Sequence, residues 1–189
     1  MAKAIKVSVI GAGSAQFSLS IVKDLCLTKG LDGSHVTFMD IDKDRLDMIY
    51  QLAARYAHQL GSALTFDKTM DRQAALQGAD FVLNAVYVLG HVVEAGMRKL
   101  AADQYGYYHS GGQFGAYHQL QLMLDVAHDM EKICPQAWLI QSGNPVFDGC
   151  TLMTRETSIK VCGLCHGHYH YREIAETIGL DPDRVTWQA

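Results

Sequence analysis

Residue types that can do chemistry gather at two late points in the chain. Cys165 and His166 are neighbours within a Cys-His-Gly-His stretch, and Asn144 lies within an earlier Gly-Asn-Pro stretch. A thiolate beside an imidazole is a suitable ligand pair for a borderline divalent ion, and it could also be a cysteine nucleophile with a lowered pKa. Taken singly, an asparagine before proline is usually a turn former and a lone cysteine is usually a core residue. The chemical interpretation therefore depends on whether the fold brings these residues together.

A glycine-rich turn near the start of the chain has the features of a phosphate-binding loop. Gly11 and Gly13 follow a short β-branched run, 5–10, and precede Ser14 and Ala15 at the start of a helical pattern. The first glycine permits the tight turn, and the second lets the backbone approach a pyrophosphate at the positive end of the helix. A glycine pair alone is weak evidence, but the preceding strand and the following helix predict a dinucleotide site.

Asp40 ends the second expected strand, where a carboxylate can accept hydrogen bonds from both ribose hydroxyls of an adenosine. The same carboxylate would repel a 2′-phosphate, which favours NAD over NADP. Lys43 and Arg45 lie close by in the sequence and weaken this preference. The alternative is that Asp40 only caps the next helix.

Hydrophobic periodicity predicts strands alternating with helices along the rest of the chain. We expect strands at 5–10, 36–39, 64–67, 80–86, 137–141 and 159–164, and helices at 14–29, 42–60, 71–76, 92–104, 119–133, 148–156 and 170–178, with a loop over 105–117. Such alternation predicts one doubly wound α/β domain of the Rossmann type, like lactate and malate dehydrogenases, with a mainly parallel sheet of strand order 3-2-1-4-5-6. Asn84, Asn144 and the pair Cys165 and His166 would then face one crevice at successive strand ends, near the nicotinamide end of the cofactor.

Composition limits the class of protein further. The 189 residues are 49% hydrophobic and 19% charged, with a net charge of -4, which is typical of a globular domain and argues against a general nucleic-acid binder. No window approaches the ~20 apolar residues that a membrane span requires, and the N-terminus lacks a signal-peptide pattern, so we expect a cytoplasmic protein. Five cysteines, an odd number, argue against a disulfide framework, and most are expected to be buried thiols.

Several segments together resemble glycoside hydrolase family 4, and most closely its α-glucosidase and α-glucuronidase branch. They are VSVIGAGSAQFS, FMDID, KLAADQYGYY, SGNPVFDG and CHGHY, in this order along the chain. The resemblance implies an NAD- and divalent-metal-dependent redox elimination on an α-glycoside, with manganese as the usual metal, in place of the pair of carboxylates that most glycosidases use. NAD would take a hydride from C3 of the sugar, and the metal would polarise the resulting ketone.

The resemblance also implies roles for individual residues. Cys165 would be a metal ligand and Asn144 and His166 would contact substrate or metal as catalytic residues, while the cofactor would be held by Gly11, Gly13, Ser14 and Asp40, with Ala15 and Asn84 as further cofactor-binding candidates. We expect residues 1–189 to form the NAD-binding domain, without the family's C-terminal substrate and oligomerisation region and its second metal-ligating histidine. Relatives are usually dimers or larger, so a homo-oligomer is expected.

The acid that family members place after the YGYY segment has no counterpart, because 104–124 contains no Asp or Glu. Because half of the metal site is missing as well, these residues alone are expected to bind NAD with little or no hydrolysis. Two rival functions remain open. A lactate- or malate-type 2-hydroxy-acid dehydrogenase would need a substrate-binding arginine, for which only Arg98 and Arg155, both on expected helices, are central candidates. The other rival is a non-catalytic NAD-binding module.

Overall fold

The computed structural model describes residues 4–106, 116–165 and 170–186. Within them, six parallel strands form one sheet in the order β3-β2-β1-β4-β5-β6, which confirms the predicted strand order. The strands are β1 (Lys6–Ile10), β2 (His35–Met39), β3 (Thr65–Thr69), β4 (Phe81–Asn84), β5 (Trp138–Gln141) and β6 (Lys160–Gly163). A doubly wound Rossmann-type fold is therefore confirmed.

The last residues of the strands form a level row across the sheet. Ile10 pairs with Met39 on one side and with Asn84 on the other, and Asn84 pairs in turn with Gln141. Gln141 pairs with Gly163 at the end of β6. The loops that follow these strands therefore begin at the same edge of the sheet, where an open α/β fold keeps its ligand crevice.

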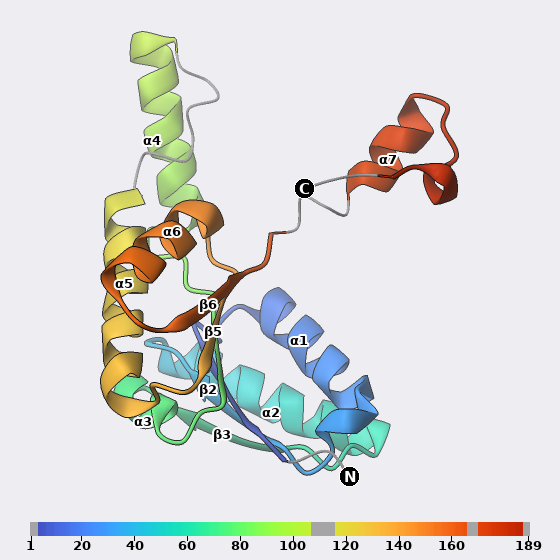
Figure 1. The fold of residues 1–189 in the computed structure, drawn as a ribbon, viewed down its shortest axis with the longest axis vertical. Helices are drawn as coiled ribbons and strands as arrows, with labels where there is room; N and C mark the ends of the chain where they lie inside the picture. Colours follow the sequence, from blue (N-terminus) through green and yellow to red (C-terminus); the bar gives the residue numbers. More distant parts are fainter. Residues whose placement is uncertain (1–3, 107–115, 166–169, 187–189) are drawn as a thin grey trace.

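Helices cover both faces of the sheet (Figure 1). One face carries α1 (Ala15–Leu27) and α2 (Lys43–Leu60), and the other carries α3 (Arg72–Leu76), α5 (Ala116–Ile133) and α6 (Val146–Glu156). The remaining elements are η1 (Lys29–Leu31), α4 (Gly90–Tyr105), α7 (His170–Thr177) and η3 (Pro182–Arg184). Burial on both faces explains why the inner strands β1, β2 and β4 are mostly apolar along their length instead of alternating, whereas the edge strands β3 and β6 are largely exposed.

Two apolar cores result from this layering. Val9 and Phe38 are fully buried beneath α1 and α2, and Val82 and Leu139 are fully buried beneath α5. A buried polar residue among them, Ser8, donates its hydroxyl to the Ala75 carbonyl of α3 at 2.6 Å.

The predicted bounds agree with most of these elements, with two corrections. The third strand, expected at 64–67, is Thr65–Thr69, because its parallel pairing with β2 continues as far as Thr69. The loop expected over 105–117 is shorter at both ends, since Tyr105 still belongs to α4 and Tyr117 to α5. Residues 107–115 lie outside the described part. In the described ranges, no helix combines the length and the apolar character that a membrane crossing requires.

The expectation that most cysteines are buried is wrong. All five lie in the described ranges and form no disulfide there, as expected, but only Cys134 is buried. Cys162 and Cys165 are exposed, while Cys26 and Cys150 are half-buried. Cys162 lies on β6, which is one of the two edge strands of the sheet.

Candidate functional site

The glycine turn is held against the end of β2. The backbone N–H groups of Gly11 and Ala12 both donate to the Met39 carbonyl, at 2.9 and 3.0 Å. Gly11 has a φ of 84°, which favours glycine. A Cβ atom at this position would also lie 2.7 Å from Val86 Cγ2 and 2.8 Å from the Val86 backbone nitrogen. The turn after β1 and the loop after β4 are therefore in contact, and only glycine fits between them.

The carboxylate of Asp40 binds the second glycine of the turn. The Gly13 N–H donates to Asp40 Oδ2 at 2.6 Å, and the Asp42 N–H donates to Asp40 Oδ1 at 2.9 Å. A Cβ atom on Gly13 would lie 2.7 Å from Asp40 Oδ2, so glycine is required there by the carboxylate. The structure thus brings together two elements that the sequence separates, and it places them at the same edge of the sheet.

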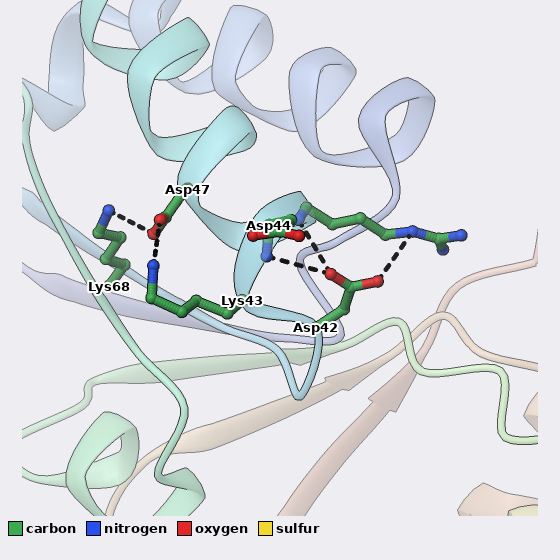
Figure 2. A network of polar contacts seen from close by, with 6 residues as sticks. Asp42, Lys43, Asp44, Asp47 and Lys68 are labelled. Carbon is green, nitrogen blue, oxygen red and sulfur yellow. Dashed lines mark hydrogen bonds and ion pairs between the residues drawn. The ribbon is translucent and has the colours of Figure 1, made fainter.

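Asp40 is not the cap of the following helix, which was the alternative interpretation. That role belongs to Asp42, whose side chain accepts from the N–H groups of Asp44 and Arg45 (Figure 2). Asp71 caps α3 in the same way. The carboxylate of Asp40 instead joins the glycine turn to the loop after β2.

The start of α1 differs from these two capped helices. Ser14 occupies the N-cap position and is exposed, yet within the described residues its side chain makes no capping hydrogen bond, and the first turn carries no acid. The side chain of Ala15 lies outside the part of the chain that the structure describes. The first backbone N–H groups of a helix have no partner within it and carry the positive end of its dipole. Because the Ser14 side chain makes no capping hydrogen bond among the described residues, these N–H groups are open to an anion.

The cations nearest to Asp40 in the sequence are paired with carboxylates of their own helix. Lys43 binds Asp47 at 2.7 Å, and Lys68 of β3 binds the other oxygen of Asp47 at 2.6 Å (Figure 2). The hydrogen bond between Lys43 and Asp47 raises the pKa of Lys43. The hydrogen bonds that Asp47 accepts from Lys43 and Lys68 lower the pKa of Asp47. Arg45 pairs with Asp42 at 3.2 Å. These pairs engage the two cations that weakened the sequence-based preference for NAD.

The asparagine at the end of β4 is built into the interior. Asn84 is fully buried, its amide nitrogen donates to Gln141 Oε1 at 3.0 Å, and its Oδ1 accepts from the Val86 N–H at 3.3 Å. Its backbone carbonyl accepts from the N–H groups of Ser142 and Gly143. Asn84 therefore links the loops after β4 and β5, and the contact predicted between its side chain and a cofactor stays a prediction.

The other predicted residues follow β5 and β6. Asn144 is exposed and precedes Pro145 through a cis peptide bond at the start of α6. Cys165 is also exposed and comes directly after Leu164, whose N–H donates to the Gln141 carbonyl at 2.9 Å. The segments that carry Asn144 and Cys165 therefore leave the sheet from hydrogen-bonded neighbouring strands, as predicted. His166 lies outside the described residues.

Two glutamines at this edge were not singled out from the sequence. Gln141 and Gln119 are buried and bind the backbone of the loops after β4 and β5. For Gln141 a signal was present, because a polar residue ends an apolar strand beside Asn84. For Gln119 the signal was its position on the buried face of α5 that also carries Met123 and Val126.

Among the described residues, no three His, Cys, Asp or Glu side chains gather around a common point where a metal ion could bind. The donors at this edge are the exposed thiol of Cys165 and the exposed amide of Asn144. A thiolate suits a borderline divalent ion. The thiol of Cys165 could therefore serve as one ligand of such an ion.

These observations define a doubly wound Rossmann-type α/β domain whose glycine turn and β2 carboxylate lie at the edge where such folds bind ligands. The family model described as family 4 glycosyl hydrolase matches residues 6–180, and the chain belongs to this family.

One curated relative agrees with this family in sequence, and one solved structure shares the fold. An alpha-galactosidase of Bacillus subtilis (strain 168) is 31% identical over 191 residues, which cover 95% of this chain and 44% of the relative. The chain thus spans less than half the length of that relative. A 6-phospho-alpha-glucosidase from gut microorganisms, solved with NAD and Mn²⁺, has a TM-score of 0.81 at 16% identity, covering 97% of this chain and 43% of that chain.

The likeness to dehydrogenases is one of fold. A lactate dehydrogenase from Eimeria maxima, solved with NADH and oxamate, has a TM-score of 0.70 at 14% identity, and the match covers 98% of this chain and 52% of that one. The predicted lactate/malate dehydrogenase-like architecture is therefore confirmed, while family membership separates this chain from that class of enzyme.

Proposed function

We propose that this chain is the NAD-binding domain of a glycosidase that cleaves α-glycosides with the help of NAD and a divalent metal ion such as Mn²⁺. Family membership supports a glycosidase. The single observation that carries the NAD assignment is the 2.6 Å hydrogen bond from the Gly13 N–H to Asp40 Oδ2. It joins the phosphate turn to the carboxylate that would receive the adenosine ribose, so both halves of the adenosine diphosphate site form one unit.

The adenosine half of the cofactor would be held by the chain's first two loops. The pyrophosphate would lie against the turn of Gly11 and Gly13 and the uncapped start of α1 at Ser14 and Ala15, whose N–H groups attract an anion. Asp40 would accept hydrogen bonds from the ribose hydroxyls and repel a 2′-phosphate. The ion pairs of Lys43 and Arg45 with neighbouring carboxylates support the choice of NAD over NADP.

The nicotinamide half and the sugar would lie beyond β4, β5 and β6. NAD supplies a hydride acceptor and the metal supplies a Lewis acid for the sugar oxygens. In this chain, Cys165 would contribute a thiolate to the metal, and Asn144 and His166 would orient the substrate or complete the ligand set. Both Asn144 and Cys165 are exposed, which suits residues that contact a ligand. Asn84 would support this half of the site from beneath.

A cytoplasmic location and a homo-oligomer stay predictions. Large apolar side chains on α4 and at the start of α6 are exposed, among them Val92 (87%), Leu100 (71%) and Phe147 (73%). Exposed apolar surface of this kind is consistent with association.

The proposal is tested by measuring p-nitrophenol release from p-nitrophenyl α-glucoside, α-galactoside and α-glucuronide under reducing conditions. Each assay is run with NAD and Mn²⁺ together, with either alone, and with neither, and NAD binding is measured in parallel by calorimetry. We expect the chain to bind NAD, and we expect hydrolysis in the whole protein to require both cofactors. Accumulation of NADH with a 2-hydroxy acid would indicate a dehydrogenase instead, and NAD binding by a whole protein without turnover would indicate a non-catalytic module.

A further inference from the structure

A group of buried side-chain amides lies directly beneath the proposed nicotinamide half of the site. We infer that Gln119 and Gln141 are positioning residues that fix the loops after β4 and β5, and thereby set the affinity for the nicotinamide half of NAD but not for its adenosine half. The inference rests on the proposed function, because it assigns a task to residues within that same site.

Gln141 connects the ends of two strands to the loop of Asn144. It is fully buried at the end of β5, where its Oε1 accepts from Asn84 Nδ2 at 3.0 Å and its Nε2 donates to the Gly143 carbonyl at 2.7 Å. The carbonyl it binds belongs to the residue directly before Asn144. The side chain of Gln141 therefore fixes the backbone from which Asn144 projects.

Gln119 connects α5 to the loop after β4. Its exposed fraction is 4%; its Nε2 donates to the Val86 carbonyl at 2.7 Å and its Oε1 accepts from the Val88 N–H at 2.9 Å. The oxygen and the nitrogen of the Gln119 amide thus both bind the loop between β4 and α4. Without Gln119, those two backbone groups would lose their side-chain partner, and the half-buried segment from Val86 to the exposed Val88 would lose its connection to α5.

The two glutamines meet at Gly143. A Cβ atom on Gly143 would lie 2.6 Å from the Val86 carbonyl oxygen, 3.2 Å from Gln141 Nε2 and 3.4 Å from Gln119 Nε2. Val86 in turn contacts Gly11 on its other side. The loops after β1, β4 and β5 are therefore stacked in contact, with Val86 in the middle and the amides holding it.

Only an amide satisfies both partners at each of these positions. A carboxylate would accept but not donate, a hydrophobic side chain would do neither, and an unpaired buried polar group is costly. In a sheet of this order, a dinucleotide crosses the switch point between β1 and β4 with its adenosine over β2 and its nicotinamide over β4 and β5. The hydrogen bonds of both glutamines go to the second set of loops, which meets the first turn only through the contact of Val86 with Gly11, so their loss should affect NAD more than ADP.

The test compares Gln119→Met with Gln121→Met in the same chain. Methionine keeps the length and volume of glutamine but removes both hydrogen bonds. Gln121 lies on the same helix, is exposed and bonds only Asp125 among its described partners, so it controls for the change of residue type. Affinities for NAD and for ADP are measured by calorimetry, and hydrogen exchange of the Val88 N–H is measured by NMR without ligand.

We expect Gln119→Met to bind NAD about tenfold more weakly than wild type, which corresponds to one or two lost hydrogen bonds. Its affinity for ADP should stay within about twofold of wild type, as should both affinities of Gln121→Met, because neither glutamine forms a hydrogen bond with the adenosine loops among its described partners. Exchange of the Val88 N–H should accelerate in Gln119→Met alone. A general loss of structure would weaken both ligands together, so the split between NAD and ADP separates positioning from stability.

Equal loss of NAD and ADP affinity, or NAD affinity equal to that of Gln121→Met, would overturn the inference while leaving the proposed function intact. If wild type binds neither ligand, the proposed function falls and the inference with it. Gln141→Met provides a second variant with the same expected split, should Gln119→Met fail to fold.

Discussion

The replacement Gly13→Ala tests the contact on which the site depends. Because no positive φ is required at Gly13, alanine brings no backbone strain, and the only obstacle is space. Its Cβ atom would lie 2.7 Å from Asp40 Oδ2 and 2.9 Å from Asp40 Cγ. The carboxylate must therefore retreat, and its 2.6 Å hydrogen bond with the residue-13 N–H is weakened or lost.

The magnitude follows from these two effects. Overpacking by one methyl group costs about 1–3 kcal/mol, and a hydrogen bond to a charged group contributes about 1.5–3 kcal/mol. Because Asp40 is a short side chain at the edge of the sheet and can move, we expect the free energy of unfolding to fall by about 1–3 kcal/mol, with a loss of about 2–12 °C in Tm. The affinity for NAD should fall by at least about tenfold, since the displaced carboxylate is the group that would receive the adenosine ribose.

Thermal denaturation followed by circular dichroism and calorimetric titration with NAD measure the two effects. Gly30→Ala is the matched control, because a Cβ atom on Gly30 meets nothing within 4 Å and its φ is not positive. The same replacement is then made in an Asp40→Ala background, where the obstacle is gone. There Gly13→Ala should cost less than about 0.5 kcal/mol, since the interaction energy belongs to the pair.

Two results would refute the reasoning. One is a Gly13→Ala variant as stable and as competent in NAD binding as Gly30→Ala. The other is a stability loss from Gly13→Ala that is equally large with and without Asp40, which would place the cause elsewhere in the turn.

Three further predictions concern the scaffold. The side chain of Asp129 accepts a hydrogen bond from Arg72 Nε of α3 at 2.8 Å, and Asp129→Asn removes this ion pair. The replacement should lower the free energy of unfolding, measured in urea, by about 1–3 kcal/mol. An unchanged urea midpoint would contradict a stabilising pair. Burial raises the pKa of Cys134 to about 11, so mass spectrometry after alkylation at pH 8 should find Cys162 modified in the native protein and Cys134 only after unfolding; early modification of Cys134 would show that it is accessible. Hydrogen bonds from the backbone and side chain of Ser158 lower the pKa of Glu131 from 4.5, so its contribution to stability is present above that value and is lost as pH falls through the lower folded pKa. The stabilities of wild type and Glu131→Gln should therefore differ at pH 7 and converge in acid, and a gap that is independent of pH would contradict the pairing.

Much of the scaffold could be predicted because its signals are local. The apolar runs of β1, β2 and β4 and the helical periodicity between the strands specify alternating elements, and chain order with right-handed crossovers then limits the topology. Bounds were less accurate where a tertiary partner decides them, as in β3, whose last residues are strand because β2 extends beside them.

The sequence predicted which residue types lie at the strand ends of the site. It did not predict the contacts between those residues. Nothing local to Gly13 reveals that its missing side chain makes room for Asp40, because the two are far apart in the chain and meet only through the pairing of β1 with β2. The tasks of Gln119 and Gln141 were missed for the same reason. A buried glutamine can be suspected from its place in an apolar pattern, but its backbone partners come from loops that only the folded sheet brings together.

The most direct test of the account is a calorimetric titration of the chain with NAD and, separately, with NADP. The account predicts saturable binding of one NAD per chain, at least about tenfold tighter than NADP, because the carboxylate at the end of β2 accepts a ribose hydroxyl and repels a phosphate in its place. Equal affinity for the two dinucleotides, or no saturable binding of NAD, would contradict it.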